Sequence, residues 1–502
     1  MTRTPHPSSD SREPMSSQQK AVLAVLLVPT FASLLSVSSV NVLLAVIQDT
    51  LNASASDLQW VIAAYSLVFG VLLVAAGRAG DVLGRARVFV VGLALFGLGS
   101  LGCALSGSIV ALNLSRVVMG AGAGLFNPQV TGMIQRVFPG PMRGRAFGWF
   151  GAVVGVSVAL GPLMSGVLLQ LLGDDVGWRA SFAVNTPIAA AGVLAALKVL
   201  PGRTGQGAAV EDAADGRADH VGGTAGGARR RADVDPVGMV LLGAAMLLLM
   251  LPFVSLGTGA AGLASGAGAL GCLVAWVVWE RRYLARGREP MVDLRLLRQR
   301  PFTAGCALIT VYFFGCTSIW IVVAQYIQQG LGRSALTAGL VGLPCSLATA
   351  VLAPVLGRHV LRSGRVMVLG GVGVVVAGLA LTVAAVATGL DESLGVWVLA
   401  LALLLAGAGQ ALVVTPNQTL SLLEVPLRYA GTAGGVLQTG QRLGTAVGVA
   451  VISSLAFSVA ARSGWEHGLQ VGLGAVIVSL LVSGVIALWD LLASRRQPPT
   501  AR

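Results

Sequence analysis

The stretch Gly77-Arg78-Ala79-Gly80-Asp81-Val82-Leu83-Gly84-Arg85-Ala86-Arg87 lies between two apolar runs and combines glycines with one acid and several arginines. The flanking runs, 58–77 and 88–108, have about the twenty residues that an α-helix needs to cross ~30 Å of hydrocarbon. Glycines permit the backbone angles and the close approach that a tight turn between helices requires. The stretch therefore predicts a short charged turn between two membrane-spanning helices.

The composition of the whole chain indicates a membrane protein. Of the 502 residues, 55% are hydrophobic and 11% are charged, whereas a soluble domain has roughly one-quarter charged residues. Apolar runs of spanning length recur along the chain and predict fourteen helices. These are 21–47, 58–77, 88–108, 109–134, 146–170, 180–200, 236–256, 262–280, 302–325, 336–356, 366–389, 395–420, 431–459 and 468–489. We therefore expect an all-α polytopic membrane protein.

The positive charges test this count, because Lys and Arg gather in the cytoplasmic loops of membrane proteins. With the N-terminus inside, only Arg179, Arg333 and Arg462 fall outside, and only Arg116 and Arg442 fall within helices. The alternation predicts that both termini are cytoplasmic, and it explains the net charge of +13 without nucleic-acid binding. The Arg-, Ala- and Gly-rich composition is typical of a GC-rich bacterial genome, so we expect a bacterial cytoplasmic (inner) membrane.

The sequence contains no pattern that predicts a cofactor, a metal ion or catalysis. The cysteines all fall inside apolar runs and the histidines in tails or loops, which argues against disulfides and zinc-ligand spacing. The acid pair Asp174-Asp175 has no second pair nearby, whereas a membrane-embedded enzyme would need convergent carboxylates. The only lysines, Lys20 and Lys198, do not belong to a Walker-type loop, so ATP-driven transport is also disfavoured.

A weak internal repeat indicates two related halves, as in many transporters. The spacing of Gly77, Gly84 and Arg85 recurs in Gly357, Gly364 and Arg365. The predicted units are an N-terminal tail (1–20), a six-helix bundle (21–200), a flexible linker (201–235), two inserted helices (236–280), a loop (281–301), a second six-helix bundle (302–489) and a C-terminal tail (490–502). The linker is either a plain tether or, through its run of three arginines, a lipid-binding segment.

The stretch 77–87 resembles the loop signature of the major facilitator superfamily. In that family the acid and the basic residues form a latch between the two halves at the cytoplasmic face. Val82 stands where the family usually has a basic residue. The alternative is a positive loop that only sets topology. The resemblance implies a cytoplasmic gating loop made of Gly77, Asp81, Gly84, Arg85 and Arg87.

A second signature lies in the run 146–170. The string Gly161-Pro162-Leu163-Met164-Ser165-Gly166 resembles the Gly-Pro motif of the superfamily's antiporters, with serines in place of two glycines. The resemblance implies an antiporter motif at Gly161, Pro162 and Gly166. Together with Gly155 and Ala159, Pro162 and Gly166 form a small-residue stripe, so plain helix packing is the alternative.

Stretches in most of the predicted helices resemble the fourteen-helix drug:proton antiporters of the EmrB/QacA type. They are Gln59-Trp60-Val61 with Tyr65, Arg116 to Gly120, Trp178-Arg179 with Phe182, Asn185 and Pro187, Tyr326 to Pro344, and Gly440 to Ala450. The resemblance implies a major facilitator fold of two six-helix bundles plus two inserted helices. It also implies a monomer that exports a small amphipathic drug, antibiotic or natural product against protons. An uptake permease of the same fold is the alternative.

The chain departs from these antiporters in its buried charges. Ser36 stands where they usually carry an acid, a few positions before Asn41, and no Asp or Glu lies deep in a predicted span. Arg116 and Arg442 are buried instead, and a charge near the bilayer centre costs ~3 kcal/mol or more unless it faces a cavity or a partner. For Arg116, a coupling role and a structural role bonded to backbone carbonyls both remain open.

We expect Arg442 to line a central cavity, because Gln438 and Gln441 share its face of the helix. The candidate coupling or cavity residues are Arg116, Arg442, Gln438, Gln441, Gln410, Asn127, Tyr65, Ser36 and Asn41. A cavity with two arginines and no acid should prefer neutral or anionic amphipaths over lipophilic cations. The expected partners are thus a small-molecule substrate, protons and the lipid bilayer.

Overall fold

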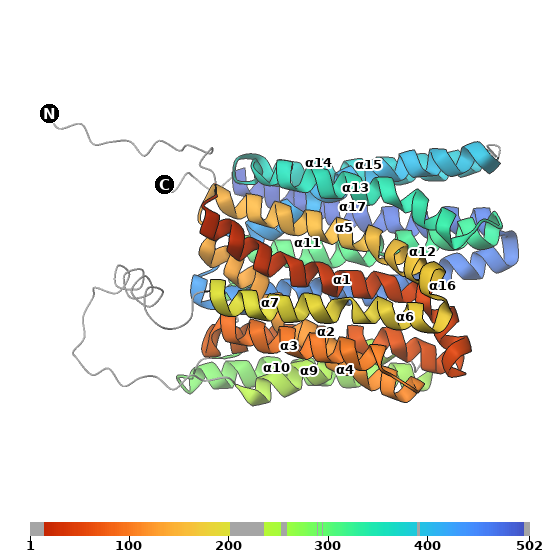
Figure 1. Cartoon of the computed structure of the whole chain (residues 1–502). Coiled ribbons are helices and arrows are strands. Elements are labelled where there is room, and N and C mark those ends of the chain that lie inside the picture. Colours follow the sequence, from red (N-terminus) through yellow and green to blue (C-terminus); the bar gives the residue numbers. More distant parts are fainter. Residues whose placement is uncertain are drawn as a thin grey trace, which may run out of the picture.

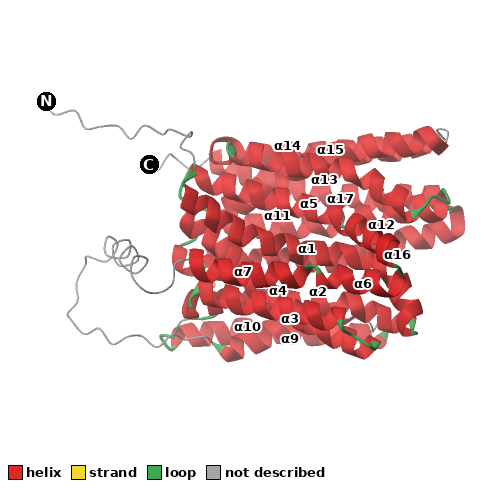
Figure 2. Cartoon of the chain, viewed as in Figure 1, coloured by secondary structure: helices red, strands yellow, loops and turns green. Residues whose placement is uncertain are grey.

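The computed structural model describes residues 15–200, 235–252, 259–288, 290–293, 295–388 and 392–495. Every regular element within these ranges is a helix (Figure 2). Among the described residues, thirteen helical spans are long and apolar enough to cross a membrane, so the chain is a multi-pass membrane protein. The predicted span 236–256 corresponds to a shorter apolar helix, Pro236–Leu251. The count of fourteen therefore stays a prediction, and the predicted linker falls almost wholly outside the described residues.

The first half of the chain forms one bundle of long helices lying side by side (Figure 1). Its elements are α1 (Ser17–Leu51), α2 (Ala55–Leu83), α3 (Arg85–Ala104), α4 (Ile109–Val137), α5 (Pro141–Leu172), α6 (Asp174–Ala183) and α7 (Asn185–Val199). The pair α6 and α7 makes up the single span that was predicted as 180–200. Asp174 and Asp175 form the first turn of α6, and carboxylates are favourable at a helix N-terminus.

The second half repeats this arrangement. Its elements are η2 (Leu296–Arg298), α11 (Arg300–Cys316), α12 (Ser318–Gln325), η3 (Tyr326–Gly330), α13 (Ala335–Gly357), α14 (Val360–Ala387), α15 (Glu392–Ser421), η4 (Leu427–Tyr429), α16 (Ala430–Ser463) and α17 (Trp465–Arg495). The predicted helix 302–325 is built from α11, α12 and the π-helical turn η3, which together form one span.

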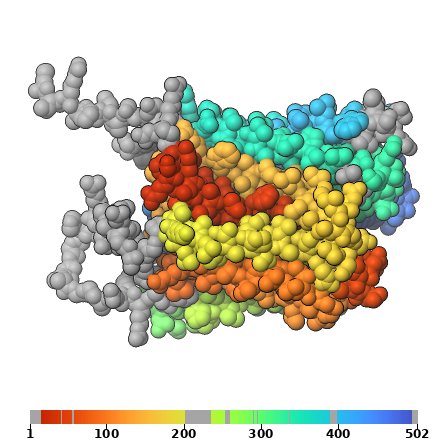
Figure 3. All heavy atoms as spheres, viewed as in Figure 1, coloured from red at the N-terminus to blue at the C-terminus, as the bar shows by residue number. Residues whose placement is uncertain are grey.

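The inserted pair consists of α9 (Pro236–Leu251) and α10 (Ala260–Ala285), which pack against each other. Helix α9 also packs against α2, where Val74 joins Leu242, Met246, Trp276 and the segment Met291–Val292 in a small apolar core. Figure 3 shows the pair in green along one edge of the first half, opposite the cyan helices of the second half. The predicted insertion therefore packs on α2 at the edge of the first bundle, with a smaller contact to α16 of the second half.

The two halves meet where α2 packs against α16 and where α5 packs against α13. The second contact is close because it is made by glycines. A Cβ atom added at Gly144 would lie 3.3 Å from the carbonyl carbon of Gly357. Near the same end of the bundle, Gln19 of α1 donates to the carbonyl of Val137 at the end of α4. We call this end, which also holds the turn between α2 and α3, the latch end.

Candidate functional site

The turn between α2 and α3 is a single residue, Gly84, with a φ of +101°. This is the left-handed region that favours glycine. The turn brings Asp81 and Arg85 together across the helix ends, with 2.8 Å between Asp81 Oδ1 and Arg85 Nη2. Both side chains are almost completely buried. The predicted gating loop therefore contains a buried ion pair.

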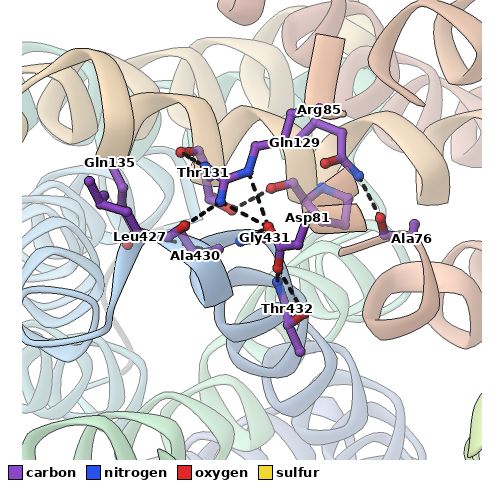
Figure 4. A network of polar contacts seen from close by, with 12 residues as sticks. Ala76, Asp81, Arg85, Gln129, Thr131, Gln135, Leu427, Ala430, Gly431 and Thr432 are labelled. Atoms are coloured by element: carbon purple, nitrogen blue, oxygen red, sulfur yellow. Dashed lines mark hydrogen bonds and ion pairs between the residues drawn. The ribbon is translucent and has the colours of Figure 1, made fainter. Parts of the chain in front are cut away.

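Asp81 also binds the first turn of α16, in the other half of the molecule (Figure 4). Its carboxylate accepts hydrogen bonds from Gly431 N at 3.0 Å and from Thr432 N and Oγ1 at 2.9 Å each. The first N–H groups of a helix lack partners within the helix, and the N-terminus carries a partial positive charge. Tyr429, the residue before α16, supplies no side-chain cap. Asp81 therefore caps a helix some 350 residues further along the chain.

Arg85 completes this contact from the same side. Its Nη2 donates to the carbonyl of Leu427 at 2.6 Å, just before α16, and its Nη1 donates to the carbonyl of Gly132 in α4. We call Asp81 and Arg85, with their partners at the start of α16, the latch. Arg87, which was predicted to belong to the gating loop, is exposed and makes no hydrogen bond or ion pair with any described residue.

Gly77 permits the close approach of α2 and α16. A Cβ atom added there would lie 2.7 Å from the carbonyl carbon of Gly431 and 3.0 Å from Thr432 Cα. Both distances are shorter than ordinary van der Waals contact, so a residue with a side chain at position 77 would force α2 and α16 apart. Of the predicted gating residues, Gly77, Asp81, Gly84 and Arg85 therefore meet at one place.

The last turns of α4 contribute polar residues that the sequence did not single out. Gln129 Nε2 donates to the carbonyl of Ala76 at 2.7 Å, and Gln135 Nε2 donates to the carbonyl of Ala430 at 3.4 Å. Both glutamines are fully buried beside the latch (Figure 4). The available signal was their position in and just after the predicted span 109–134, because amides that become buried there need hydrogen-bond partners.

The predicted antiporter motif packs against α1 through one of its glycines. Ser39 Oγ of α1 donates to the carbonyl of Gly161 at 3.0 Å, and a Cβ atom at Gly161 would overlap Ser38 Oγ. Ser157 lies one turn earlier on the same face, and its carbonyl accepts from Ser38 Oγ at 3.0 Å. The residues that replace glycine in the motif, Ser157 and Ser165, are fully buried.

The other motif residues lie elsewhere on α5. No heavy atom outside the local helix lies within 4 Å of a Cβ atom added at Gly166. Pro162 is half-buried within an uninterrupted α5. A Cβ atom added at Gly155 would lie 2.9 Å from the carbonyl oxygen of Ser346 in α13. The expected stripe is thus divided between neighbours, and the face packed on α1 contains Ser157 and Gly161.

This difference gives a paired prediction for α5. Gly161→Leu should lower the folded yield and the thermal unfolding temperature, because the new side chain has no space between α5 and α1. Gly166→Leu should leave both unchanged. Fluorescence-detected size-exclusion chromatography of heated membranes extracted in detergent would measure the two variants side by side. Equal effects would contradict the assignment of the packed face.

Arg116 lies in the core of the first half, with 1% of its surface exposed. Its Nε donates to the carbonyl of Val61 at 2.8 Å, and its Nη1 donates to Ser36 Oγ at 3.4 Å. The guanidinium carbon lies 4.5 Å from the centre of the Tyr65 ring and 5.8 Å from that of Phe182. This is the environment of a structural arginine bonded to a neighbouring helix; a role in coupling stays a prediction.

A row of rings connects Arg116 to Arg442. The rings of Tyr65 and Phe69 are stacked, with centres 5.9 Å apart and planes inclined by 10°. The Arg442 guanidinium lies 4.4 Å from the centre of the Phe69 ring, so α16 of the second half contacts α2 of the first. We call Arg116, Tyr65, Phe69 and Arg442 the cation–π row. Phe69 was missed in the sequence, although it stands one turn after Tyr65.

Arg442 carries a charge without a counter-charge: no carboxylate forms an ion pair with it among the described residues. It is half-buried, as is Gln441. One turn earlier, Gln438 is 8% exposed, and its Nε2 has no partner in the described part of the chain. A cation–π contact contributes only ~0.5–2 kcal/mol. Arg442 and Gln438 therefore offer positive charge and an unused hydrogen-bond donor on one helix face.

The remaining cavity candidates are not brought to this place by the described contacts. Gln410 accepts from Thr349 Oγ1 at 3.4 Å and donates to Cys316 Sγ at 3.4 Å, within the second half. Asn127 donates to the carbonyl of Ala123 in its own helix at 3.0 Å. The side chain of Asn41 lies outside the described residues. The candidate site thus reduces to the cation–π row with Gln438.

Comparisons with known proteins agree with this architecture. The chain is 32% identical over 457 residues, covering 89% of this chain and 74% of the other, to the probable actinorhodin transporter of Streptomyces coelicolor. It is 31% identical over 411 residues to the tetracenomycin C resistance and export protein of Streptomyces glaucescens, covering 82% and 70%. The human organic anion transporter MFSD10 has the same fold, with a TM-score of 0.62 at 17% identity, covering 94% of this chain and 100% of that structure.

The family model described as Major Facilitator Superfamily matches residues 26–449. The matched residues run from α1 to the middle of α16, and so include most of both halves, the latch and the cation–π row. The fold, the latch across the two halves and the named relatives all agree with this match. The chain belongs to the major facilitator superfamily.

Proposed function

We propose that this protein is a proton-coupled exporter of the fourteen-helix drug:proton antiporter group. It moves a neutral or anionic amphipathic compound out across the bacterial cytoplasmic membrane, with both termini on the cytoplasmic side. Export is supported by relatives whose names describe antibiotic transport and resistance. Proton coupling is supported by the resemblance of the sequence to drug:proton antiporters.

The substrate class is argued from the uncompensated charge of Arg442. Opposite charges 4 Å apart attract by about 4 kcal/mol at an effective dielectric constant of 20. A carboxylate, phenolate or other acidic group at Arg442 would gain this attraction, and Gln438 could donate a hydrogen bond to it. A lipophilic cation would be repelled by Arg442, with Arg116 as a second positive charge further along the row.

The latch provides a gate on one side of this site. The hydrogen bonds and close contacts of α2 with α16 run from Asp81 and Thr432 at the latch end to Phe69 and Arg442 near the middle of the helices. A substrate bound at Arg442 would therefore lie at the border of the latched region. Release and reformation of the latch would open and close its path to the latch end, which we assign to the cytoplasm.

Substitution of Arg442 tests this proposal. In proteoliposomes with an imposed pH gradient, Arg442→Gln should slow efflux of an anionic fluorescent amphipath about 10- to 100-fold. This corresponds to about 1.4–2.8 kcal/mol, the part of the attraction that desolvation of the two charges does not offset. Arg442→Lys should retain part of the rate because it keeps the charge. Efflux of a neutral substrate should change little.

Each part of the proposal has its own contrary outcome. Efflux that ignores the gradient would remove the proton coupling but leave the transporter. Accumulation in the opposite direction, measured in everted vesicles, would favour an uptake permease. Resistance of expressing cells to quaternary ammonium compounds, but not to neutral or acidic natural products, would contradict the substrate class.

A further inference from the structure

Two carboxyl groups are buried together in the inserted helix pair. Asp235 lies immediately before α9 and is 0% exposed; Glu280 lies near the end of α10 and is 1% exposed. In the sequence Asp235 is the last residue of the predicted linker, and Glu280 is the last residue of a predicted span. Neither position suggests burial. The folded pair places both acids at the latch end, beside the apolar core shared with α2.

The hydrogen bonds of the two groups are unequal. Asp235 Oδ1 accepts from Gly238 N at 3.0 Å and from Trp279 Nε1 at 2.9 Å, so it caps α9. Asp235 Oδ2 and Glu280 Oε2 are buried and have no partner within the described residues. Glu280 Oε1 accepts from Val292 N at a long 3.4 Å. Asp235 is therefore well placed to carry a negative charge at a helix N-terminus, and Glu280 is not.

The absence of a side chain at Gly238 brings the two acids close together. A Cβ atom added there would overlap Asp235 Oδ2 and lie 3.1 Å from Glu280 Oε1. Both oxygens thus converge on the same small space. Two carboxylates that approach the same point cannot both be ionised without strong repulsion when no cation lies between them.

The charged groups around the pair do not neutralise it. On α10, Arg281 and Arg282 are exposed. After α10, Asp293 accepts a hydrogen bond from Arg295 N. On α2, Arg78 is the basic residue that follows Val74 by one turn, and it has interactions of its own. Neither Asp235 nor Glu280 forms an ion pair in the part of the chain that is described. A buried charge without a partner is costly, and a proton is the smallest ligand that removes one.

We propose that Asp235 and Glu280 form a proton-binding site in which Glu280 holds the proton and Asp235 carries the charge. The bound proton leaves a single negative charge, stabilised by the α9 N-terminus and the Trp279 indole. Loss of the proton would place two like charges between α9 and α10, next to their contact with α2. The site therefore makes docking of the inserted pair on the first bundle sensitive to pH, whatever the transporter carries.

Infrared difference spectroscopy of the purified protein tests proton occupancy directly. The wild type should show the carbonyl stretching band of a buried protonated carboxylic acid at neutral pH, and Glu280→Gln should lack it. Asp293→Asn is the matched control, because Asp293 is also buried at this end but is not part of the pair; it should keep the band. A band that survives in Glu280→Gln, or no such band in the wild type, would overturn the proposal.

Thermal unfolding in detergent gives a second readout. A proton held in the folded state stabilises it at low pH, and this stabilisation is lost as pH rises and the pair ionises. Glu280→Gln mimics the protonated acid, so its unfolding temperature should fall less than that of the wild type as pH rises. Failure of Glu280→Gln to fold would also overturn the proposal, since it would show that the charged form is required. Asp235→Asn should make Glu280 release its proton at a lower pH, seen as earlier loss of the infrared band.

Discussion

Replacement of Asp81 by alanine should reduce transport about 100-fold or more. The substitution removes three hydrogen bonds to α16 and leaves the Arg85 guanidinium buried without its carboxylate. Loss of one partner of a buried pair costs ~3–5 kcal/mol, and each 1.4 kcal/mol changes an equilibrium tenfold. The latched state should therefore become rare, which initial efflux rates in proteoliposomes would measure at equal protein content.

Two further variants separate the parts of this effect. Asp175→Ala removes an ion pair of the same i, i+4 type, but its side chain is 64% exposed, so transport should be unchanged. Arg85→Leu in the Asp81→Ala background removes the unpaired charge and should recover part of the transport rate. The rest of the loss should remain, because the N-terminus of α16 is still uncapped. Efflux of Asp81→Ala at the wild-type rate would contradict a gating role for the latch.

Replacement of Arg116 by alanine should destabilise the protein by about 3 kcal/mol. The change leaves a cavity beneath Tyr65 and Phe182 and removes the hydrogen bond to Val61, together worth several kcal/mol. The desolvation cost of the guanidinium disappears as well, which reduces the net loss. Thermal unfolding of the purified variant in detergent would show the effect as a lower unfolding temperature and folded yield.

Arg442→Ala is the matched comparison, because Arg442 contacts the other end of the same row but is half-buried. Its unfolding temperature should stay close to that of the wild type while its transport of anions falls. If Arg116→Ala were as stable as Arg442→Ala but inactive, the coupling role of Arg116 would be favoured over the structural one. Substitution of Arg116 should thus lower the unfolding temperature, and substitution of Arg442 should lower anion transport.

The sequence predicted the parts of the latch that lie close together in the chain. Asp81 and Arg85, four residues apart on either side of a glycine turn, were identified through the resemblance to the superfamily's loop signature. It could not identify Gly431 and Thr432 as partners, because nothing local connects α2 with the start of α16. The one available hint was negative: Tyr429 precedes α16, where a Ser, Thr, Asp or Asn cap would be usual.

The candidate site was predicted less completely for a different reason. Arg116 and Arg442 were found because charges are rare in apolar runs, yet the rings between them look like ordinary apolar residues in the sequence. Phe69 acquires its role only when α2 and α16 are packed together. Asp235 and Glu280 were overlooked because each falls at the edge of a predicted element, where acids are normally solvated. Burial at such an edge depends on tertiary packing, which spacing does not reveal.

The capping of α16 by Asp81 also bears on how the protein is made. The ribosome completes α2 long before α16 emerges, so Asp81 and Arg85 are without their α16 partners until that helix is synthesised. Until then the Asp81 carboxylate has no N–H groups of α16 to accept hydrogen bonds from. When α16 is made, its N-terminus depends on Asp81, because Tyr429 supplies no side-chain cap. The last steps of biogenesis in the two bundles are therefore shared, and neither bundle reaches its final form before α16 is inserted.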